Sequence, residues 1–229
     1  MKIKICCIKS KVELKKAIDE GVQNVGFVSQ MPSGPGIIDD QTIRELAFHA
    51  PKDVNTFLLT SRNTVKEVIQ QWCYCRTTTI QLCWPFSPEN LHQIKQALPD
   101  INIVPVLHVN GATSLNKTHQ MLHASHSILL DTGNPNAKIP TLGGTGETHN
   151  WEISQKIRRA WPDREIWLAG GLSAANVHIA IRDVDPSGVD VCSGVRTNDQ
   201  LDCSKLRAFL EQVATASRLD EASQIRNSN

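Results

Sequence analysis

The stretch EIWLAGGLSAANVHIAIRDVDPSGVDVCSG, residues 165–194, sets the pattern of the whole chain. It holds two short apolar runs, Glu165 to Ala169 and Gly188 to Val191, with one helical segment between them. Both runs are almost continuously apolar, as strands of a parallel sheet are when helices cover both faces. The stretch therefore predicts a strand–helix–strand unit, and each of its strands is followed closely by glycine.

Apolar runs of this kind recur along the chain, and segments with apolar residues at helical spacing, such as Leu14, Ala17 and Ile18, separate them. The alternation indicates βαβ units around a parallel sheet. An open doubly wound sheet is an alternative, but the number of runs and the length of 229 residues favour a closed TIM (β/α)8 barrel. The runs are Ile3–Ile8, Asn24–Val28, Asn55–Leu59, Thr78–Leu82, Ile101–Leu107, Ser127–Asp131, Glu165–Ala169 and Gly188–Val191.

The composition is that of a single globular domain, with 40% hydrophobic and 21% charged residues. We expect the barrel to span residues 1–216. The remaining segment, residues 217–229, is polar and without pattern, and we expect a frayed tail there.

Charge and cysteine content narrow the classes of function. A formal net charge of +1 provides no long-range attraction for nucleic acid or for an anionic membrane. The chain begins MKIKICCIKS, without the long apolar stretch of a signal peptide or membrane span, and we expect a cytoplasmic protein. Seven cysteines, an odd number, favour reduced thiols over a disulfide framework. The cluster of Cys73, Cys75 and Cys83 lacks the spacing of a structural zinc site, so no metal is expected.

Glycine-rich turns follow the last three predicted strands. They are Gly143 to Gly146, Gly170 with Gly171, and Ser193 with Gly194. Glycines let backbone amides approach an anion closely, so three such turns at one end of a barrel predict a phosphate cradle. The alternative is that these glycines only make tight turns between strands and helices.

Two ionisable residues stand at predicted strand ends, where a barrel carries its chemistry. Cys6 lies near the end of the first strand and Asp131 ends the sixth, so a closed barrel turns both toward the mouth as a candidate acid/base pair. A thiol accepts a proton only as thiolate, which requires nearby positive charge from Lys4 or a helix start. The alternatives are a small buried thiol at Cys6 and simple capping by Asp131. Asp190 could bind substrate or pair with a neighbouring strand.

Several segments together resemble the phosphoribosylanthranilate isomerase family of tryptophan biosynthesis, and they occur in the family's order. The match is tight over about the last 100 residues and thin between about 30 and 125. The segments are KICCIK (Lys4 to Lys9), NVGFV (Asn24 to Val28), ILLDT (Ile128 to Thr132), GGTGETHNW (Gly143 to Trp151), WLAGGLSAANV (Trp167 to Val177) and GVDVCSGV (Gly188 to Val195).

The resemblance implies an aldose–ketose type isomerase that performs an Amadori rearrangement of N-(5-phosphoribosyl)anthranilate to 1-(2-carboxyphenylamino)-1-deoxyribulose 5-phosphate. It implies that Cys6 is the general base and Asp131 the general acid, and that no metal or organic cofactor takes part. A small phosphorylated substrate is the implied partner, and the chain is expected to be a monomer or a homodimer. The residues that the resemblance assigns to the phosphate are Gly144, Thr145, Gly146, Gly170, Gly171, Ser193 and Gly194.

The sequence departs from the family pattern at several points. Cys7 replaces the glycine that usually follows the catalytic cysteine, and Cys83 stands in the pattern that usually ends the fourth strand with histidine. The loop Met31 to Ile38 lacks the family's arginine, which contacts the anthranilate part. Arg196 replaces a glutamate, and we expect it to contact the substrate carboxylate instead. The alternatives are a barrel isomerase for another phosphorylated sugar or amine, with a rebuilt aglycone pocket, and a binding protein without turnover.

Overall fold

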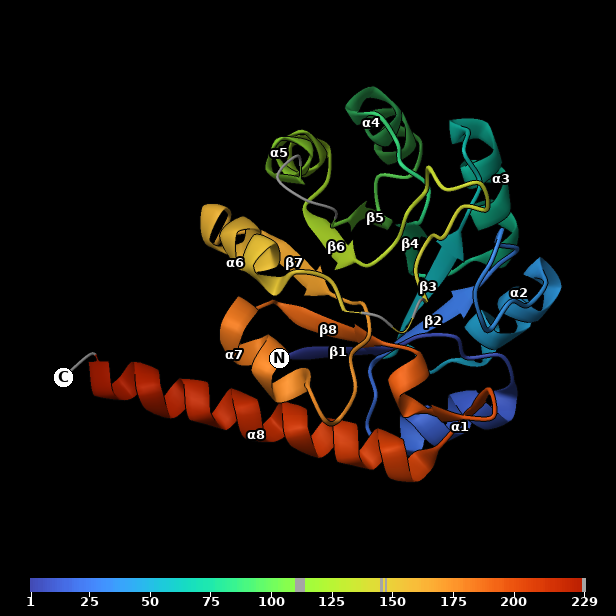
Figure 1. Ribbon diagram of the computed structural model, residues 1–229. Helices are drawn as coiled ribbons and strands as arrows, with labels where there is room; N and C mark the ends of the chain where they lie inside the picture. The colour runs from blue at the N-terminus through green and yellow to red at the C-terminus, as the bar shows by residue number, and fades with distance from the viewer. Residues whose placement is uncertain (110–113, 145, 147, 228–229) are drawn as a thin grey trace.

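Eight parallel strands close into a barrel in the computed structural model, which describes residues 1–109, 114–144, 146 and 148–227 (Figure 1). Strands β1 and β8 pair in parallel, with Ile5 opposite Val191, and this pairing closes the ring. The predicted TIM barrel is therefore confirmed and the open sheet is excluded. The strands are β1 Lys2–Ile5, β2 Asn24–Val28, β3 Asn55–Thr60, β4 Thr79–Leu82, β5 Asn102–His108, β6 Ser127–Asp131, β7 Glu165–Leu168 and β8 Gly188–Val191.

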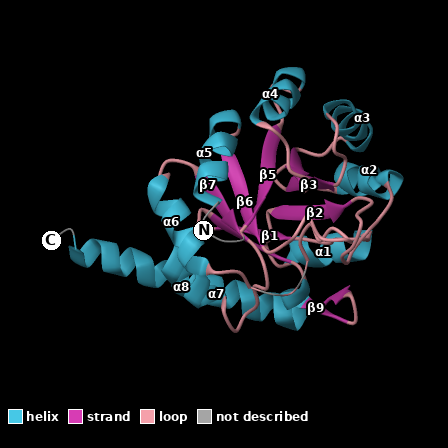
Figure 2. Ribbon diagram, turned by 45° about the horizontal axis from the view of Figure 1, so that its top comes forward, coloured by secondary structure: helices cyan, strands magenta, loops and turns pink. Residues whose placement is uncertain are grey.

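Helices surround the barrel as an outer layer (Figure 2). A short 3₁₀ helix, η1 Ser193–Val195, and a small hairpin of β9 Arg196–Thr197 with β10 Gln200–Leu201 follow the last barrel strand. The α-helices are α1 Lys11–Asp19, α2 Asp40–His49, α3 Val65–Cys75, α4 Pro88–Ala97, α5 Ser114–Ala124, α6 Trp151–Ala160, α7 Val177–Val184 and α8 Cys203–Asn227.

Side-chain caps fix where several of these helices begin. Ser87 precedes α4, its Oγ accepts a hydrogen bond of 3.3 Å from the amide of Asn90, and Pro88 occupies the first helical position. Proline suits that position because its missing N–H would have no helical partner there. Ser10 caps α1 in the same way, through the amide of Glu13.

Alternation along the strands separates two apolar layers. In β6, Ile128 and Leu130 point outward and pack in the core beneath the helices, whereas Leu129 belongs to the cluster inside the barrel. Asp131 shares the parity of Leu129 and therefore points inward. The same rule turns Lys4, between the outward Ile3 and Ile5, into the barrel. The alternation along the strands thus determines which polar side chains point into the barrel.

Helix α8 is longer than the barrel it covers. It packs beside α7, and its last turns project beyond the other elements (Figure 1). The expected domain boundary at residue 216 lies inside this helix, where Ala216 is its last buried apolar residue with a described side chain. No helix in the described part of the chain is both long and apolar enough to cross a membrane.

The fold predicts that the first half of α8 contributes strongly to stability. Phe209 is fully buried in the outer core, whereas its neighbour Leu210 is only partly buried. Phe209→Ala is expected to lower the free energy of unfolding by about 3–5 kcal/mol, because it removes a large buried side chain and leaves a cavity. Urea denaturation followed by circular dichroism measures this. Leu210→Ala is the matched control, and an equal loss in both variants would contradict the packing described.

Candidate active site

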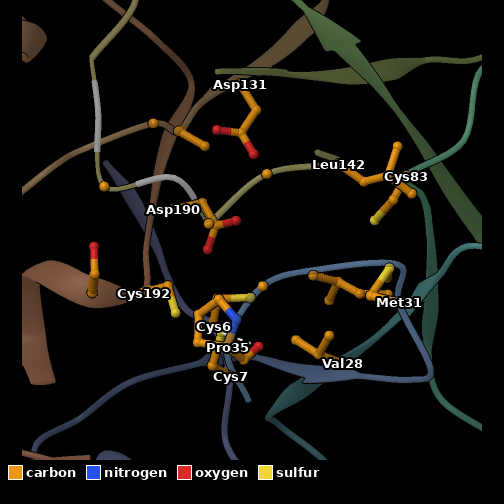
Figure 3. A pocket seen from close by; sticks show the side chains of 18 of the residues that line it. Cys6, Cys7, Val28, Met31, Pro35, Cys83, Asp131, Leu142, Asp190 and Cys192 are labelled. Carbon is orange, nitrogen blue, oxygen red and sulfur yellow. Dashed lines mark hydrogen bonds between the residues drawn. The ribbon is translucent and has the colours of Figure 1, made fainter. Parts of the chain in front are cut away.

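A pocket opens at the C-terminal mouth of the barrel, and both predicted catalytic residues line it (Figure 3). Cys6 enters from the end of β1 and Asp131 from the end of β6, on opposite sides of the ring. Asp190 of β8 lines the pocket too and interacts electrostatically with both residues. The acid/base candidates therefore share one cavity, as the closed barrel requires.

Cys6 is almost completely buried, and its surroundings favour the thiolate. A hydrogen bond from the Cys7 side chain lowers the pKa of the Cys6 thiol, and the charge of Lys4 lowers it further. Burial and the negative charge of Asp190 act in the opposite direction, but the resulting pKa is below the ordinary value. The backbone amide of Cys6 donates to the carbonyl of Val191 over 2.8 Å, which fixes the residue against β8.

The charge beside Cys6 comes from a fully buried lysine. Lys4 Nζ lies 2.8 Å from Asp190 Oδ2 and 5.2 Å from the centre of the Phe57 ring. Burial alone would lower the pKa of Lys4, but Asp190 raises it above the ordinary value, so the ammonium is retained. Gly26 of β2 makes room for this arrangement, because an added Cβ would lie 3.1 Å from both Lys4 Cε and Cys6 Sγ.

Asp131 is tuned toward the protonated form. Burial raises its pKa, the negative charge of Asp190 raises it further, and the result is about 7. The amide of Thr132 donates to Asp131 Oδ1 over 2.7 Å and, together with Lys4, limits the rise. A carboxyl group with a pKa of about 7 is able to donate a proton near neutral pH.

The late glycine turns pack directly around these groups. An added Cβ at Gly143 would lie 2.4 Å from Asp131 Oδ2, and one at Gly170 would lie 2.3 Å from Thr132 Oγ1, so neither position has room for a side chain. An added Cβ at Gly146 would lie 3.7 Å from Ser193 Oγ, which joins the turn after β6 to the turn after β8. Three turns from separate strands therefore meet at one side of the pocket.

The predicted phosphate residues are gathered there with two exceptions. Thr145 lies outside the described residues. Gly194 does not line the pocket, but an added Cβ there would lie 2.0 Å from the carbonyl oxygen of Leu172, so it allows η1 to pack against the segment after β7. The predicted residues that line the pocket are Gly144, Gly146, Gly170, Gly171 and Ser193.

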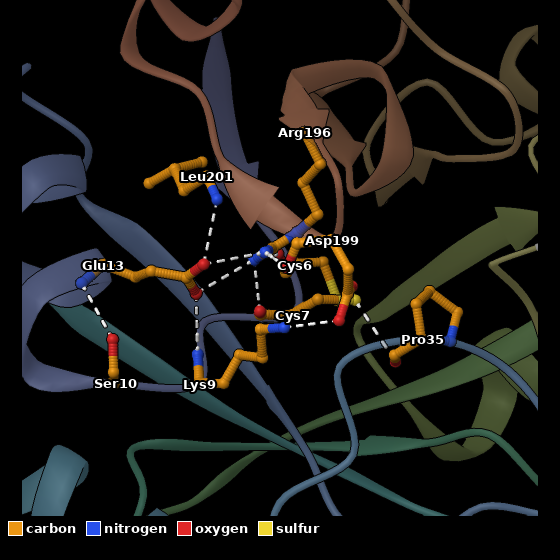
Figure 4. A network of polar contacts seen from close by, with 9 residues as sticks. All are labelled: Cys6, Cys7, Lys9, Ser10, Glu13, Pro35, Arg196, Asp199 and Leu201. Atoms are coloured by element: carbon orange, nitrogen blue, oxygen red, sulfur yellow. Dashed lines mark hydrogen bonds and ion pairs between the residues drawn. The ribbon is translucent and has the colours of Figure 1, made fainter.

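Arg196 does not line the pocket, in contrast to its expected role toward a substrate carboxylate. Its Nη1 lies 2.9 Å from Glu13 Oε1, and its Nη2 donates to the carbonyl oxygens of Cys6 and Cys7 (Figure 4). Glu13 also accepts hydrogen bonds from the amides of Lys9 and Leu201. Through these contacts Arg196 supports the backbone that carries Cys6.

The pocket also contains Asp190, for which the sequence left substrate binding or strand pairing open, and Gln81, which was not singled out from the sequence. Gln81 Oε1 and Asp190 Oδ1 are buried polar atoms without a hydrogen-bond partner among the described residues, and both side chains line the pocket. Strand parity could have indicated Gln81, since it follows the inward Thr79 in β4. Among the described residues, no group of three or more His, Cys, Asp or Glu side chains is placed to hold a metal ion.

One part of the pocket lining is mainly apolar. It is formed by the segment after β2 and by the ends of β3 and β4, including Val28, Met31, Leu59 and Cys83. No lysine or arginine is found among the described residues that line the pocket. This end of the site therefore suits an uncharged, flat or hydrophobic group.

Comparisons with known proteins identify the family and the fold. The family model for N-(5'-phosphoribosyl)anthranilate (PRA) isomerase matches residues 3–212. A relative from Moorella thermoacetica, named N-(5'-phosphoribosyl)anthranilate isomerase, is 32% identical over 94% of this chain and 91% of its own length. The crystal structure of phosphoribosyl anthranilate isomerase from Thermotoga maritima has the same fold, with a TM-score of 0.79, 24% identity, and coverage of 94% of this chain and 99% of that one.

A further structure of similar fold is that of phosphoribosyl anthranilate isomerase in complex with reduced 1-(o-carboxyphenylamino)-1-deoxyribulose 5-phosphate. It superposes with a TM-score of 0.77 at 22% identity, and the match covers 94% of this chain and 99% of that chain. At this level of identity the likeness concerns the fold.

The network around Arg196 predicts a stability effect. Glu13→Gln leaves the buried guanidinium without its counter-charge and is expected to lower the free energy of unfolding by roughly 3 kcal/mol. Urea denaturation measures the change. Asp19→Asn, which breaks the exposed pair with Lys15, is the control and should leave stability within error. Equal effects of the two substitutions would contradict the assignment.

Proposed function

The chain belongs to the N-(5'-phosphoribosyl)anthranilate isomerase family, and on this premise we propose that its barrel mouth performs the family's rearrangement with Cys6 as general base and Asp131 as general acid. The substrate would be N-(5-phosphoribosyl)anthranilate and the product 1-(2-carboxyphenylamino)-1-deoxyribulose 5-phosphate. Asp131 would protonate the ribose ring oxygen as the C1′–O bond breaks and a Schiff base forms. Cys6 would then remove the proton from C2′, and the resulting enolamine becomes the ketone. C1′ is reduced and C2′ is oxidised within the same molecule, so the reaction needs no external oxidant or reductant.

The observation that carries this proposal is the opposite tuning of the two groups within one pocket. The pKa of Cys6 is lowered, first by the hydrogen bond from Cys7 and then by Lys4, while burial raises that of Asp131 to about 7. Near neutral pH a fraction of the molecules therefore holds a thiolate and a protonated carboxyl group at once. The first proton transfer requires the protonated carboxyl group, and the second requires the thiolate.

We assign the substrate phosphate to the side where the glycine turns meet. Gly144, Gly146, Gly170, Gly171 and Ser193 line that side, and their backbone amides are suitable donors to an anion. The close packing of Gly143 and Gly170 against Asp131 and Thr132 would place a phosphate near the acid. Asp190 Oδ1 and Gln81 Oε1 supply acceptors for ribose hydroxyl groups between phosphate and aglycone.

All side chains of the proposed site come from one chain, so both a monomer and a homodimer would be competent. We further propose a cytoplasmic location, which the state of the thiols supports, since all seven cysteines are free.

Substitution of either proton-transfer residue tests the proposal. Cys6→Ser and Asp131→Asn are each expected to lower kcat by a factor of about 10²–10⁴, the usual contribution of a positioned acid or base. The loss of substrate fluorescence after mixing with freshly prepared N-(5-phosphoribosyl)anthranilate measures turnover. Cys203→Ser, outside the pocket, is the control. Wild-type turnover that persists in either pocket variant would argue against the assigned roles.

The raised pKa of Asp131 predicts the alkaline limb of the pH profile. The acid must be protonated, so kcat/KM should fall as the pH rises through about 7, the pKa of the free enzyme's carboxyl group. In Asp131→Asn, the residual activity should lose this limb. A wild-type profile that stays flat between pH 6 and pH 9 would exclude Asp131 as the acid.

The uncharged end of the pocket favours a second candidate, an isomerase for another phosphorylated amine. A buried carboxylate without a cationic partner is unfavourable, and the apolar side of Met31, Leu59 and Cys83 offers none among its described residues. Values of kcat/KM for the N-phosphoribosyl derivatives of anthranilate and aniline, measured side by side, decide between the two. The second candidate predicts that aniline is preferred by roughly tenfold or more, the effect of about 1.4 kcal/mol. A preference for the carboxylated substrate rejects it.

A further inference from the structure

The pocket contains more thiol groups than the proposed isomerisation uses. Four cysteines line it, namely Cys6, Cys7, Cys83 and Cys192, and all of them are free thiols. Only Cys6 has a part in proton transfer. The other three raise the question of what neighbouring thiols do beside a reactive one.

Cys7 holds the central position among them. Cys6 and Cys7 belong to the cluster inside the barrel and Cys192 packs against that cluster, and Cys192 and Cys6 both raise the pKa of the Cys7 thiol. The backbone supports this arrangement, because the amide of Cys6 bonds to the carbonyl of Val191 at 2.8 Å and so fixes the Cys6–Cys7 segment beside the segment that carries Cys192. Figure 3 shows the three sulfur-bearing side chains together at one side of the pocket, with Cys83 at the other.

The backbone at Cys7 adopts an unusual conformation for this purpose. Its φ is +63°, in the left-handed region that favours glycine and costs other residues roughly 1–2 kcal/mol. The side chain is nevertheless present, is 3% exposed, and contacts the carbonyl oxygen of Pro35 at 3.7 Å. The strained backbone at Cys7 therefore places a thiol beside Cys6 and Cys192, where a glycine would leave empty space.

The surroundings give the thiols of the pocket different reactivities toward an oxidant. Hydrogen bonding from Cys7 and the charge of Lys4 lower the pKa of Cys6, so it is the thiol that an oxidant attacks first. The hydrogen bonds to Cys192 and Cys6 raise the pKa of Cys7, so it stays protonated and unreactive toward peroxide. Burial raises the pKa of Cys83 as well.

We propose that Cys7 and Cys192 form a disulfide that carries oxidation away from Cys6, with a hydroperoxide as the oxidant. The inference takes the role of Cys6 as base from the proposed function. The disulfide itself depends only on the placement of the three thiols.

The proposed relay has three steps. The Cys6 thiolate attacks a peroxide oxygen, the O–O bond breaks, and a sulfenic acid and hydroxide form. The Cys7 thiol attacks the Cys6 sulfur, an S–S bond replaces the S–O bond, and the hydroxyl group leaves as water with the Cys7 proton. The Cys192 thiol then attacks the Cys7 sulfur and releases Cys6 as a thiolate, while the Cys192 proton neutralises the hydroxide. In total, two thiols and one hydrogen peroxide give one disulfide and two water molecules.

The last exchange has a physical driving force. A disulfide between adjacent residues closes a small ring that is far from relaxed disulfide geometry, and strain makes such a bond easy to break. A disulfide between Cys7 and Cys192 would join two separate segments and would not close such a small ring. Oxidation should therefore accumulate between β1 and β8 rather than at Cys6.

Peptide mapping tests the proposal directly. The folded protein is treated with equimolar hydrogen peroxide, alkylated without reduction and digested with trypsin. The expected product joins the peptide of residues 5–9, ICCIK, to the peptide of residues 183–196, which contains Cys192, with one alkylated cysteine in the first. Fragmentation should place the alkyl group on Cys6. Dithiothreitol should separate the two peptides.

Three variants complete the experiment. Cys192→Ser should show no such link and should keep the oxidation within residues 5–9. Cys7→Gly suits the left-handed backbone and should fold, but it also removes the side chain that lowers the pKa of Cys6, so the comparison is made on the oxidised Cys6 alone. With a second equivalent of peroxide, the fraction of oxidised Cys6 that has become sulfinic acid is expected to be at least several-fold larger than in wild type. Cys73→Ser, an exposed thiol elsewhere, should map like wild type.

Two results would overturn the relay. One is a wild-type digest in which Cys6 is oxidised while the peptide of residues 183–196 stays unlinked. The other is an equal fraction of oxidised Cys6 present as sulfinic acid in wild type and in Cys7→Gly. Because mapping needs no turnover, a linked but inactive wild-type protein would count against the proposed isomerase activity and support the relay.

Discussion

The buried ion pair of Lys4 and Asp190 governs the chemistry of the barrel mouth. The two residues lie on strands that close the ring, and the same pairing that completes the sheet brings their charges to 2.8 Å. Asp190 keeps the lysine charged and raises the pKa of Asp131, and the retained ammonium lowers that of Cys6. Burial is the largest cause of the raised pKa of Asp131, and the Cys7 side chain is the largest cause of the lowered pKa of Cys6; the buried pair adds to both shifts. The pairing of β1 with β8 that closes the barrel therefore also brings together the two charges that act on Cys6 and Asp131.

Much of this arrangement was predictable from the sequence, because periodicity carries it. The eight apolar runs became the eight strands, and three of them, beginning at Asn24, Ser127 and Gly188, have the predicted bounds. The inward direction of Asp131 follows from alternation along its strand. Strand ends were less certain: the first run was expected to reach Ile8, but β1 ends at Ile5, and the positive φ of +63° at Cys7 interrupts the extended backbone there.

The roles of Arg196 and Cys192 were not predictable in the same way. A charged residue after the last strand has no pattern that identifies its partner, and the partner, Glu13, lies 183 positions away in the chain. From the sequence we expected Arg196 to contact the substrate. In the structure, its guanidinium pairs with the carboxylate of Glu13. The contact between Cys7 and Cys192 is likewise a product of barrel closure. Long-range pairing of single polar residues leaves no local trace, whereas repeated apolar spacing does.

The network of Arg196 joins the first βα turn of the chain to the hairpin that follows the last barrel strand. Its guanidinium bonds to the carbonyl groups of Cys6 and Cys7 and to Glu13, and the amide of Leu201 bonds to the same carboxylate. During synthesis the N-terminal turn leaves the ribosome first and lacks these supports until residues 196–201 have emerged. A growing chain would therefore hold Cys6 in an unsupported loop, and the mouth would acquire its shape only after residues 196–201 have joined the first turn.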